Sequence, residues 1–377
     1  MMSAARVAPG EAKAHSRGEQ RGTWPFMVAL LALCSCDPFH TSFEDNEDAV
    51  YYRAHTLSDA EESPSELLVM NWNIKFGGAR IDFFFDCFGD RVLMSEDEVV
   101  ENLKGLVRKI RQVDPDVLFL QEVDVNAKRS AFVDQLQWLL DHTDLNYGVY
   151  ASQWKADFVP SDGLGAMDDG NAILSRWPLK DAHRIALPLR SDQDALTRYF
   201  YLQRNVLSAR VELGDRELGL VAVHTDAYGS DGTKRKHIER FKDETDAFVA
   251  DGLVVVGGGD LNTLPPGSDK LSDFPDTVCT NEDFIADDYT AEQDWLKPLY
   301  AKYEPAIPLA DYQADNARYF SHTVDGRGFW NRKLDYLFTN AAWQPGSGLV
   351  HQDKAHGGME TMPLSDHAPL SAILELP

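Results

Sequence analysis

Short apolar segments of strand length alternate with segments of helical period from residue 67 to the C-terminus, and this alternation limits the fold most strongly. The first strand is predicted at Leu67–Met70, and a buried strand at Val117–Leu120 follows a helix that begins at the capping box of Ser95 and Glu98. Further strands are predicted at 148–152, 172–175, 206–213, 218–224, 253–256, 334–339 and 369–376, and further helices at 131–142 and 234–249. About ten strands with interleaved helices favour one mixed α/β domain at 67–377 over two separate domains.

The first 36 residues have the pattern of an export signal. A basic segment precedes the uncharged stretch Trp24–Leu33, which is too short to span a membrane as a helix. The sequence Leu33-Cys34-Ser35-Cys36 is similar to a bacterial lipobox, which predicts that Cys36 carries lipid chains and anchors the protein. The alternative is an ordinary cleaved signal peptide, which would release a secreted protein.

Residues 37–66 are strongly acidic and show no apolar period. They hold nine acidic residues and one arginine, which predicts a solvated tether between the anchor and the domain. With Cys36 lipidated, Cys87 and Cys279 are the remaining pair in an oxidising compartment. They form either one disulfide or two separately packed thiols.

Two stretches, 81–90 and roughly 265–315, are predicted insertions into the domain. The first contains Phe83, Phe84 and Phe85, followed by Phe88. This aromatic group has two interpretations, a contact with a membrane or a hydrophobic plug under the insertion.

The charge of the chain limits its partners. It carries 36 Lys and Arg residues against 61 Asp and Glu residues, a formal net charge of −25. A chain this acidic gains little from counterion release on duplex nucleic acid and is repelled by it at long range. General affinity for polyanions is therefore excluded as a default, although a local basic groove is compatible with the charge.

Polar side chains stand where five separate predicted strands begin or end. These residues are Asn73, Glu122, His224, Asp260 with Asn262, and Asp366 with His367. Each one alone has a plain structural explanation, as a turn former, a solvated strand end or a satisfied core histidine. Ligands gather where strand ends and their loops meet in α/β sheets, so the co-occurrence favours a functional site.

These residue types fit metal-assisted hydrolysis of a phosphoester. A hard divalent cation takes carboxylate and amide oxygens, which Glu122 and Asn73 can supply. Asp260 with Asn262 can orient and deprotonate a water molecule.

The negative charge that develops on a phosphoryl group needs hydrogen-bond donors, and His224 and His367 can provide them. A carboxylate behind a histidine fixes its tautomer and favours the imidazolium form. Asp335, in Lys333-Leu-Asp-Tyr-Leu337, is the candidate for this position.

An ordered set of short motifs runs through residues 67–377. They are Asn73-Ile74, Gln121-Glu122, Gly170-Asn171-Ala-Ile-Leu-Ser175, His224, Gly259-Asp-Leu-Asn262, Leu334-Asp-Tyr336 and Ser365-Asp-His367. The set resembles that of the endonuclease/exonuclease/phosphatase family, which includes abasic-site endonucleases, deoxyribonuclease I, neutral sphingomyelinases and inositol polyphosphate phosphatases. The resemblance implies a four-layer α/β sandwich, in which two mixed β-sheets pack face to face with helices outside.

The resemblance also implies a metal site. Glu122 is expected as the central ligand of Mg²⁺, or of Mn²⁺ in its place, with Asn73 and Asp366 near the ion. Asp260 and Asn262 are expected to position or activate the attacking water.

The remaining implied roles concern the substrate. His367, oriented by Asp335, is expected on the scissile phosphate, and the choice between Asp260 and His367 as the base stays open. His224 is expected to contact phosphate, and Asn171 is expected to bind substrate.

Two positions need separate interpretation. Lys75 stands where some nucleases of the family carry an aspartate two residues after the asparagine, which weakens the expectation of a second metal contact. Arg129 is a candidate for binding a substrate phosphate, and its alternative is a pairing with Asp124.

The sequence therefore predicts a Mg²⁺-dependent phosphodiesterase or phosphomonoesterase. It is expected to be an exported, lipid-anchored bacterial monomer that acts on a phospholipid head group or another small phosphoester. A secreted nuclease is the alternative that the charge disfavours. A non-catalytic binding lipoprotein on the same fold is a third alternative, which the joint presence of Asp260, Asp335 and His367 argues against.

Overall fold

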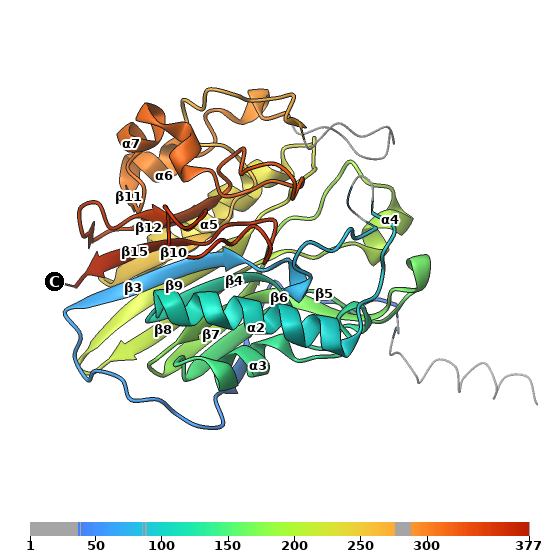
Figure 1. Ribbon diagram of the computed structural model, residues 1–377, viewed down its shortest axis with the longest axis horizontal. Coiled ribbons are helices and arrows are strands. Elements are labelled where there is room, and N and C mark those ends of the chain that lie inside the picture. The colour runs from blue at the N-terminus through green and yellow to red at the C-terminus, as the bar shows by residue number, and fades with distance from the viewer. Residues whose placement is uncertain (1–36, 38, 85, 87–88, 276–287, 377) are drawn as a thin grey trace, which may run out of the picture. The chain divides into compact units, whose positions relative to one another are not determined.

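The computed structural model describes residues 37, 39–84, 86, 89–275 and 288–376 (Figure 1). Three residues of the sequence-based predictions, Cys36, Cys87 and Cys279, lie outside these ranges, as does the predicted export signal. The compact unit that carries the strands extends from residue 38 to residue 377.

Two mixed β-sheets form the centre of this unit. Across the seven-stranded sheet the order is β1 (Asn46–Asp48), β7 (Leu179–Ala186), β8 (Asn205–Leu213), β9 (Arg216–His224), β10 (Val254–Asp260), β12 (Asp335–Thr339) and β11 (Glu304–Pro305). Across the eight-stranded sheet it is β13 (Ala342–Trp343), β15 (Leu370–Glu375), β3 (Glu66–Asn73), β4 (Val117–Asp124), β6 (Gly165–Ser175), β5 (Tyr147–Val159) and β2 (Val50–Arg53), with β14 (Leu349–Val350) paired to β15. The pairs β3–β4 and β9–β10 are parallel, and the other pairs are antiparallel.

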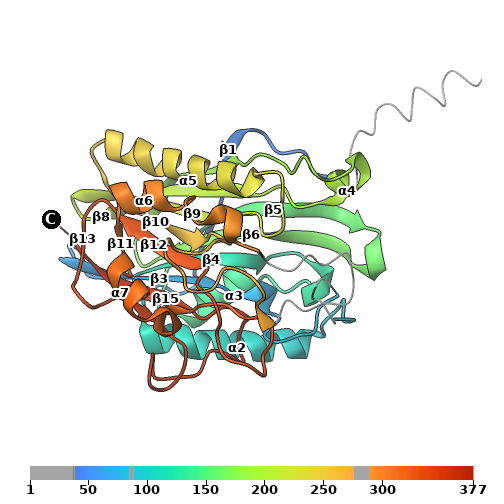
Figure 2. The ribbon, with the colours of Figure 1, turned by 90° about the horizontal axis from the view of Figure 1, so that it is seen from above.

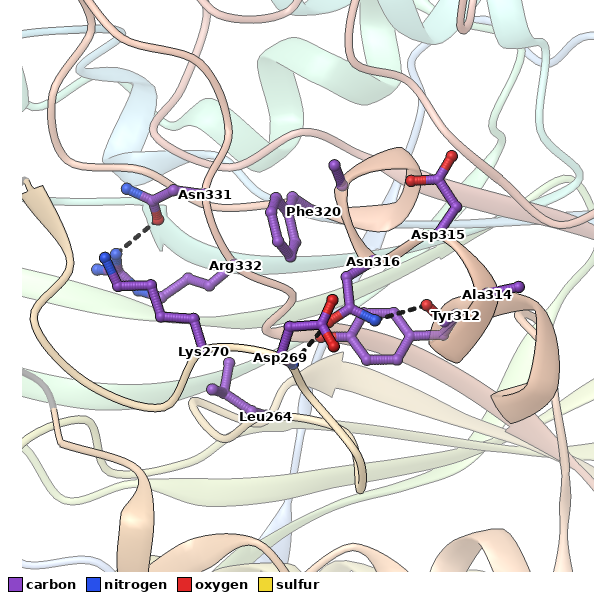
Figure 3. Close-up of a pocket in the computed structure, with 11 residues that line it drawn as sticks. Leu264, Asp269, Lys270, Tyr312, Ala314, Asp315, Asn316, Phe320, Asn331 and Arg332 are labelled. Carbon is purple, nitrogen blue, oxygen red and sulfur yellow. Dashed lines mark hydrogen bonds between the residues drawn. The ribbon is translucent and has the colours of Figure 1, made fainter.

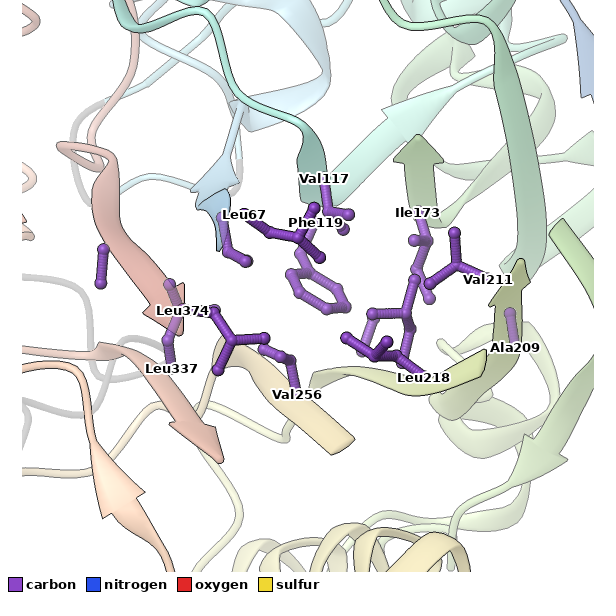
Figure 4. Packing of buried hydrophobic residues seen from close by; sticks show 14 of the residues in the cluster. Leu67, Val117, Phe119, Ile173, Ala209, Val211, Leu218, Val256, Leu337 and Leu374 are labelled. Carbon is purple, nitrogen blue, oxygen red and sulfur yellow. The ribbon is translucent and has the colours of Figure 1, made fainter. Parts of the chain in front are cut away.

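The inner faces of the two sheets pack against each other and form the main core (Figure 4). Phe119 and Ile173 from the eight-stranded sheet meet Leu218 and Val256 from the seven-stranded sheet, and each is at most 2% exposed. This burial of apolar surface holds the sheets together and fixes how their polar ends face each other.

Helices cover the two outer faces (Figure 2). On the eight-stranded sheet lie α2 (Glu96–Val113) and α3 (Gln135–His142), and on the seven-stranded sheet lie α5 (Thr233–Ala250) and α6 (Lys297–Lys302). Connecting segments hold α4 (Ala195–Phe200), α7 (Leu309–Ala314), η1 (Lys75–Gly77), η2 (Lys128–Ser130), η3 (Ser161–Gly163), η5 (Thr290–Glu292) and η6 (Asn316–Tyr319). The layers confirm the predicted four-layer sandwich.

Residues 46–53 are part of the folded sheets, which corrects the predicted tether over 37–66. β1 pairs antiparallel with β7, and β2 pairs antiparallel with β5, so each covers the edge of one sheet. These strands are short and mostly exposed. Strands of three and four residues that are mostly exposed are too short to show an apolar period, which is why the sequence pattern did not predict them.

Gly257–Gly259 belong to strand β10. Gly259 has a φ of +147°, and a Cβ atom there would lie 1.8 Å from the carbonyl oxygen of Val223 on β9. A glycine is therefore required where β10 runs beside β9. This pairing places Asp260 directly opposite His224.

Phe83, from the predicted insertion at 81–90, is 3% exposed, and its ring packs 4.9 Å from that of Phe76. The buried position agrees with the hydrophobic plug rather than with a membrane contact for this residue. Phe85 and Phe88 lie outside the described residues. Among the helices that the structure describes, none has the length and apolar character needed to cross a bilayer.

Candidate active site

The ends of strands from both sheets meet at Asn73, the last residue of β3. Its Nδ2 donates to Glu122 Oε1 at 3.0 Å within the same sheet and to Asp260 Oδ2 at 3.2 Å in the other sheet. Its Oδ1 accepts the backbone N–H of Lys75 at 3.0 Å. The amide of Asn73 thus ties two carboxylates together across the sandwich.

A β-bulge in β4 directs Glu122 toward this point. Between Leu120 and Val123 the register with β6 shifts, and Glu122 takes a φ of +56°. Bulges re-aim side chains, and left-handed non-glycine residues are concentrated at functional sites. Burial and the charge of Asp366 raise the pKa of Glu122, although its side chain keeps 27% exposure.

His367 and Asp335 form the predicted pair. His367 Nδ1 lies 2.8 Å from Asp335 Oδ2, and Asp335 also accepts from Ser321 Oγ at 2.6 Å and from Asn71 Nδ2 at 3.2 Å. Burial works against a charge on His367, but Asp335 and Asp260 outweigh it and raise the pKa of His367 to about 10. The ring is therefore an imidazolium at neutral pH.

Asp260 is the centre of the polar cluster. Its Oδ2 lies 3.4 Å from His224 Nε2 and 3.6 Å from His367 Nε2, and its Oδ1 accepts the backbone N–H of Asn262 at 3.0 Å. Burial raises the pKa of Asp260 to about 7. Such a carboxylate gains and loses a proton near neutral pH, as a general base requires.

His224 and Asn262 lie beside Asp260, where the sequence predicts them. Burial lowers the pKa of His224 well below its usual value, so the ring is neutral. Its Nε2 faces Asp260 and lies 3.9 Å from Glu122 Oε1. Its Nδ1 has no hydrogen-bond partner among the described residues. Asn262 takes a φ of +47° and donates from Nδ2 to the carbonyl oxygen of Thr225 at 3.2 Å.

Arg129 is paired with buried carboxylates, and its predicted contact with a substrate phosphate stays a prediction. Its Nε and Nη2 donate to Asp124 at 2.9 and 2.8 Å, and Nη2 also donates to Asp169 at 3.1 Å. The residue is 5% exposed, and its guanidinium stacks 3.8 Å above the ring of Phe76. The structure shows the alternative, a pairing of Arg129 with Asp124, and this pair is buried.

Asn171 is fully buried, and its Nδ2 donates to Asn205 Oδ1 at 3.2 Å across the two sheets. A substrate contact by Asn171 stays a prediction.

Asp366 lies with its Oδ2 3.5 Å from Lys75 Nζ. Burial opposes the charge of Asp366, but Lys75 and His367 outweigh it and lower its pKa.

His322 is a residue of this site that the sequence analysis missed. Its ring centroid lies 4.4 Å from that of His367, and burial lowers its pKa well below the usual value. The backbone of His322 bridges to Arg332 and His367 outside any named strand. Because it belongs to no periodic segment and no motif, only the tertiary pairing reveals it.

A separate cavity of about 280 Å³ contains none of the predicted site residues (Figure 3). It is lined by Leu264, Asp269, Lys270, Tyr312, Ala314, Asp315, Asn316, Ala317, Phe320, Asn331 and Arg332. Asp269 donates its backbone N–H to Asn316 Oδ1 at 2.9 Å, and Arg332 donates to Asn331 Oδ1 at 2.7 Å. The candidate active site is thus defined by its chemistry and not by the size of a cavity.

The donors suit a hard divalent cation. Two groups bring ligand atoms within 4.8 Å of one another, namely His322 with the half-buried Asp366 and His367, and the buried Asp260 with Asp335 and His367. Since a protonated His367 offers no lone pair, the carboxylate oxygens, including those of Glu122, fit such an ion better than the imidazole. Burial is the main cause of the raised pKa values of Glu122 and Asp260, and a bound cation would favour the charged form of both carboxylates.

Two mixed sheets with outer helices and a buried His/Asp cluster at the strand ends define a DNase I-like α/β sandwich. Residues 70–367 match the sequence profile of the Endonuclease/Exonuclease/phosphatase family, and the chain belongs to this family. Its members are metal-dependent phosphoesterases, and the candidate His/Asp site of this chain agrees with that chemistry.

The chain is similar to several solved structures. An endonuclease/exonuclease/phosphatase from Beutenbergia cavernae DSM 12333 is 19% identical with a TM-score of 0.54, over 83% of this chain and 72% of that one. The catalytic domain of human Nocturnin with bound sulfate is 16% identical with a TM-score of 0.49, over 86% and 97%. TDP2 of D. rerio, humanized by 14 mutations, is 16% identical with a TM-score of 0.49, over 83% and 100%. No curated protein matches the chain.

Proposed function

We propose that this protein is a Mg²⁺-dependent hydrolase of phosphoester bonds that acts on a lipid or another small phosphoester. The observation that carries the proposal is the His367 ring, held between Asp335 and Asp260 within the cluster to which Glu122 also belongs. An imidazolium, a carboxylate of near-neutral pKa and a cation-binding carboxylate are the groups that phosphoester hydrolysis needs in one place.

Glu122 would hold the metal ion, with the charges of Asp260 and Asp366 nearby. The bound ion would polarise the phosphoryl oxygen and neutralise the charge that develops there. The strained backbone of Glu122 and the hydrogen bond from Asn73 fix the carboxylate before any ligand binds.

Asp260 is the base in this proposal. Its pKa of about 7 allows it to take a proton from the attacking water, and hydrogen bonds from the N–H of Asn262 and from Nδ2 of Asn73 hold its two oxygens. His367 remains charged and donates a hydrogen bond to the phosphoryl group, while Asp335 keeps the ring oriented.

The charge of the chain supports a small ester over a nucleic acid. At a net charge of −25, long-range repulsion opposes the approach of a polyanion, whereas an ester with one phosphate is repelled far less.

We also propose that the protein is exported and anchored by lipid at Cys36, which would keep a monomer near phospholipid head groups. The proposal rests on the lipobox-like sequence Leu33–Cys36 alone. Cells fed radiolabelled palmitate should label the wild-type protein but not Cys36→Ser. Equal labelling of the two would refute the anchor and leave the secreted form.

A panel of substrates tests the function. The full chain is assayed with Mg²⁺ or EDTA on a generic phosphodiester, sphingomyelin, an inositol phosphate and plasmid DNA. We expect Mg²⁺-dependent turnover of a small or lipid ester that is lost in His367→Ala and kept in the control His183→Gln, whose side chain is 40% exposed on β7. Dominant plasmid nicking would favour the nuclease, and no turnover of any ester would favour the binding protein.

A further inference from the structure

Lys75 is a buried cation at the acidic end of the sandwich. Its side chain is 6% exposed, and Nζ lies 2.8 Å from Asp86 Oδ2, 3.5 Å from Asp366 Oδ2 and 3.3 Å from the carbonyl oxygen of Ile81. Two carboxylates and a carbonyl, from the 81–90 segment and from Asp366, therefore surround one ammonium group. Oxygen ligands of these types are also those that a hard metal ion takes.

The backbone is bent to deliver this side chain. Lys75 and Phe76 take φ values of +45° and +44°, in the left-handed region that bulky residues avoid. The N–H of Lys75 donates to Asn73 Oδ1 at 3.0 Å. The same asparagine holds Glu122, so the ammonium is placed relative to the candidate metal ligand by a single hydrogen-bonded residue.

The contacts of Lys75 distinguish Asp366 from the other carboxylates of the site. Asp366 faces an ammonium group, which neutralises it and repels a divalent ion approaching from that side. Among the described residues, no lysine or arginine forms an ion pair with Glu122 or Asp260. Asp260 lies 3.6 Å from Nε2 of the charged His367 ring, so Glu122 is the carboxylate of the site that has no cation at ion-pair distance among the described residues.

We propose that the Lys75 ammonium permanently takes the place of a second cation, so that the active site binds one divalent ion, at Glu122. The inference rests on the proposed function, because it concerns the metal of that same site. Lys75 is then a positioning residue, which joins Asp86 of the inserted segment to Asp366 and leaves the ion a single position.

The test is the number of Mn²⁺ ions bound per full-length chain, measured by electron paramagnetic resonance of free Mn²⁺. We expect one ion for the wild type and one for Lys75→Arg, which keeps the charge. We expect two for Lys75→Met, since Asp86, Asp366 and the Ile81 carbonyl are then open to a second ion. Lys234→Met is the matched control, because Lys234 is also buried and pairs with Glu292 at 2.8 Å, and it should bind one ion.

Two ions in the wild type, or one ion in a natively folded Lys75→Met, would overturn the inference. Asp366→Asn provides a second variant should Lys75→Met fail to fold. It should still bind one ion, and loss of that ion would show that Asp366 is its ligand and contradict the inference. A wild type that binds no ion and hydrolyses no ester would instead contradict the proposed function.

Discussion

His367 carries a positive charge because two carboxylates outweigh the cost of burying it. Asp335 Oδ2 contacts Nδ1, and Asp260 lies beyond Nε2. One carboxylate therefore orients the ring, while the other shares the space into which a phosphate would bind. The charge of a single histidine thus depends on residues of two strands in the seven-stranded sheet.

Replacing Asp335 with asparagine keeps the size of the side chain and removes the charge. We expect the pKa of His367 to fall from about 10 and phosphodiester hydrolysis to drop about 10- to 100-fold, as is typical for residues that orient a functional histidine. The measurements are kcat/KM and an NMR titration of the His367 ring. A rate within twofold of the wild type would contradict this role.

His237, on α5, gives a prediction for stability against pH. It accepts the N–H of Asp226 at 3.1 Å and contacts the carbonyl oxygen of Pro188 at 2.7 Å, and burial lowers its pKa from 6.5 to about 4. The unfolded chain therefore binds a proton before the folded one does. The contribution of His237 to the free energy of unfolding is fully present above pH 6.5, the pKa of histidine in the unfolded chain. It falls by roughly 3 kcal/mol at most as the pH drops from 6.5 through the folded-state pKa of about 4.

Urea unfolding at pH 7 and pH 4.5 measures this effect. The loss between the two pH values should be smaller in His237→Gln than in the wild type, and unchanged in the control His356→Gln, which lies on a loop. An equal pH dependence for the wild type and His237→Gln would show that this histidine does not contribute.

At the scale of elements, the approach of β10 to β9 decides where Asp260 lies. A Cβ on Gly259 would meet the Val223 carbonyl oxygen at 1.8 Å, and backbone cannot yield as a flexible side chain can. Gly259→Ala should therefore lose more than about 4 kcal/mol of unfolding free energy or fail to fold.

Gly252→Ala is the matched control for Gly259→Ala. Gly252 also has a positive φ, +81°, but nothing lies within 4 Å of its added Cβ. We expect it to lose about 1 kcal/mol in urea unfolding, the cost of the left-handed backbone alone. Similar losses in both variants would mean that the strand contact does not matter.

The strands β1 and β2 cover one edge of each sheet, and their removal gives an element-scale prediction. A chain that begins at residue 56 exposes β7 and β5 as unpaired edges. We expect its Tm to lie at least about 4 °C below that of a chain that begins at residue 38, with more aggregation in light scattering. Equal Tm values and equal scattering for the two chains would mean that residues 38–55 do not stabilise the sheets, as the tether prediction implies.

The sequence predicts the centre of the site better than its surroundings. Asn73, Glu122 and Asp260 stand at the ends of strongly apolar strands, so pattern and chemistry agree there. Arg129 and His322 owe their places to tertiary contacts that no local period records. The sequence pattern does not predict the edge strands at 46–53 for the same reason, since pairing with neighbouring strands rather than burial creates them.

At the scale of the whole molecule, the site belongs to neither sheet alone. The eight-stranded sheet supplies Asn73 and Glu122, and the seven-stranded sheet supplies His224, Asp260 and Asp335. The apolar core between the sheets therefore sets the distances on which the chemistry depends.

The most direct test of the account is the Mg²⁺ dependence of phosphodiester hydrolysis by the wild type and by Glu122→Gln, measured side by side on the full chain. The wild type should be inactive in EDTA, recover with added Mg²⁺ and saturate, while Glu122→Gln should be at least about 100-fold slower at every Mg²⁺ concentration. Turnover in EDTA, or an unchanged Mg²⁺ response in Glu122→Gln, would contradict a metal-dependent phosphoesterase centred on Glu122.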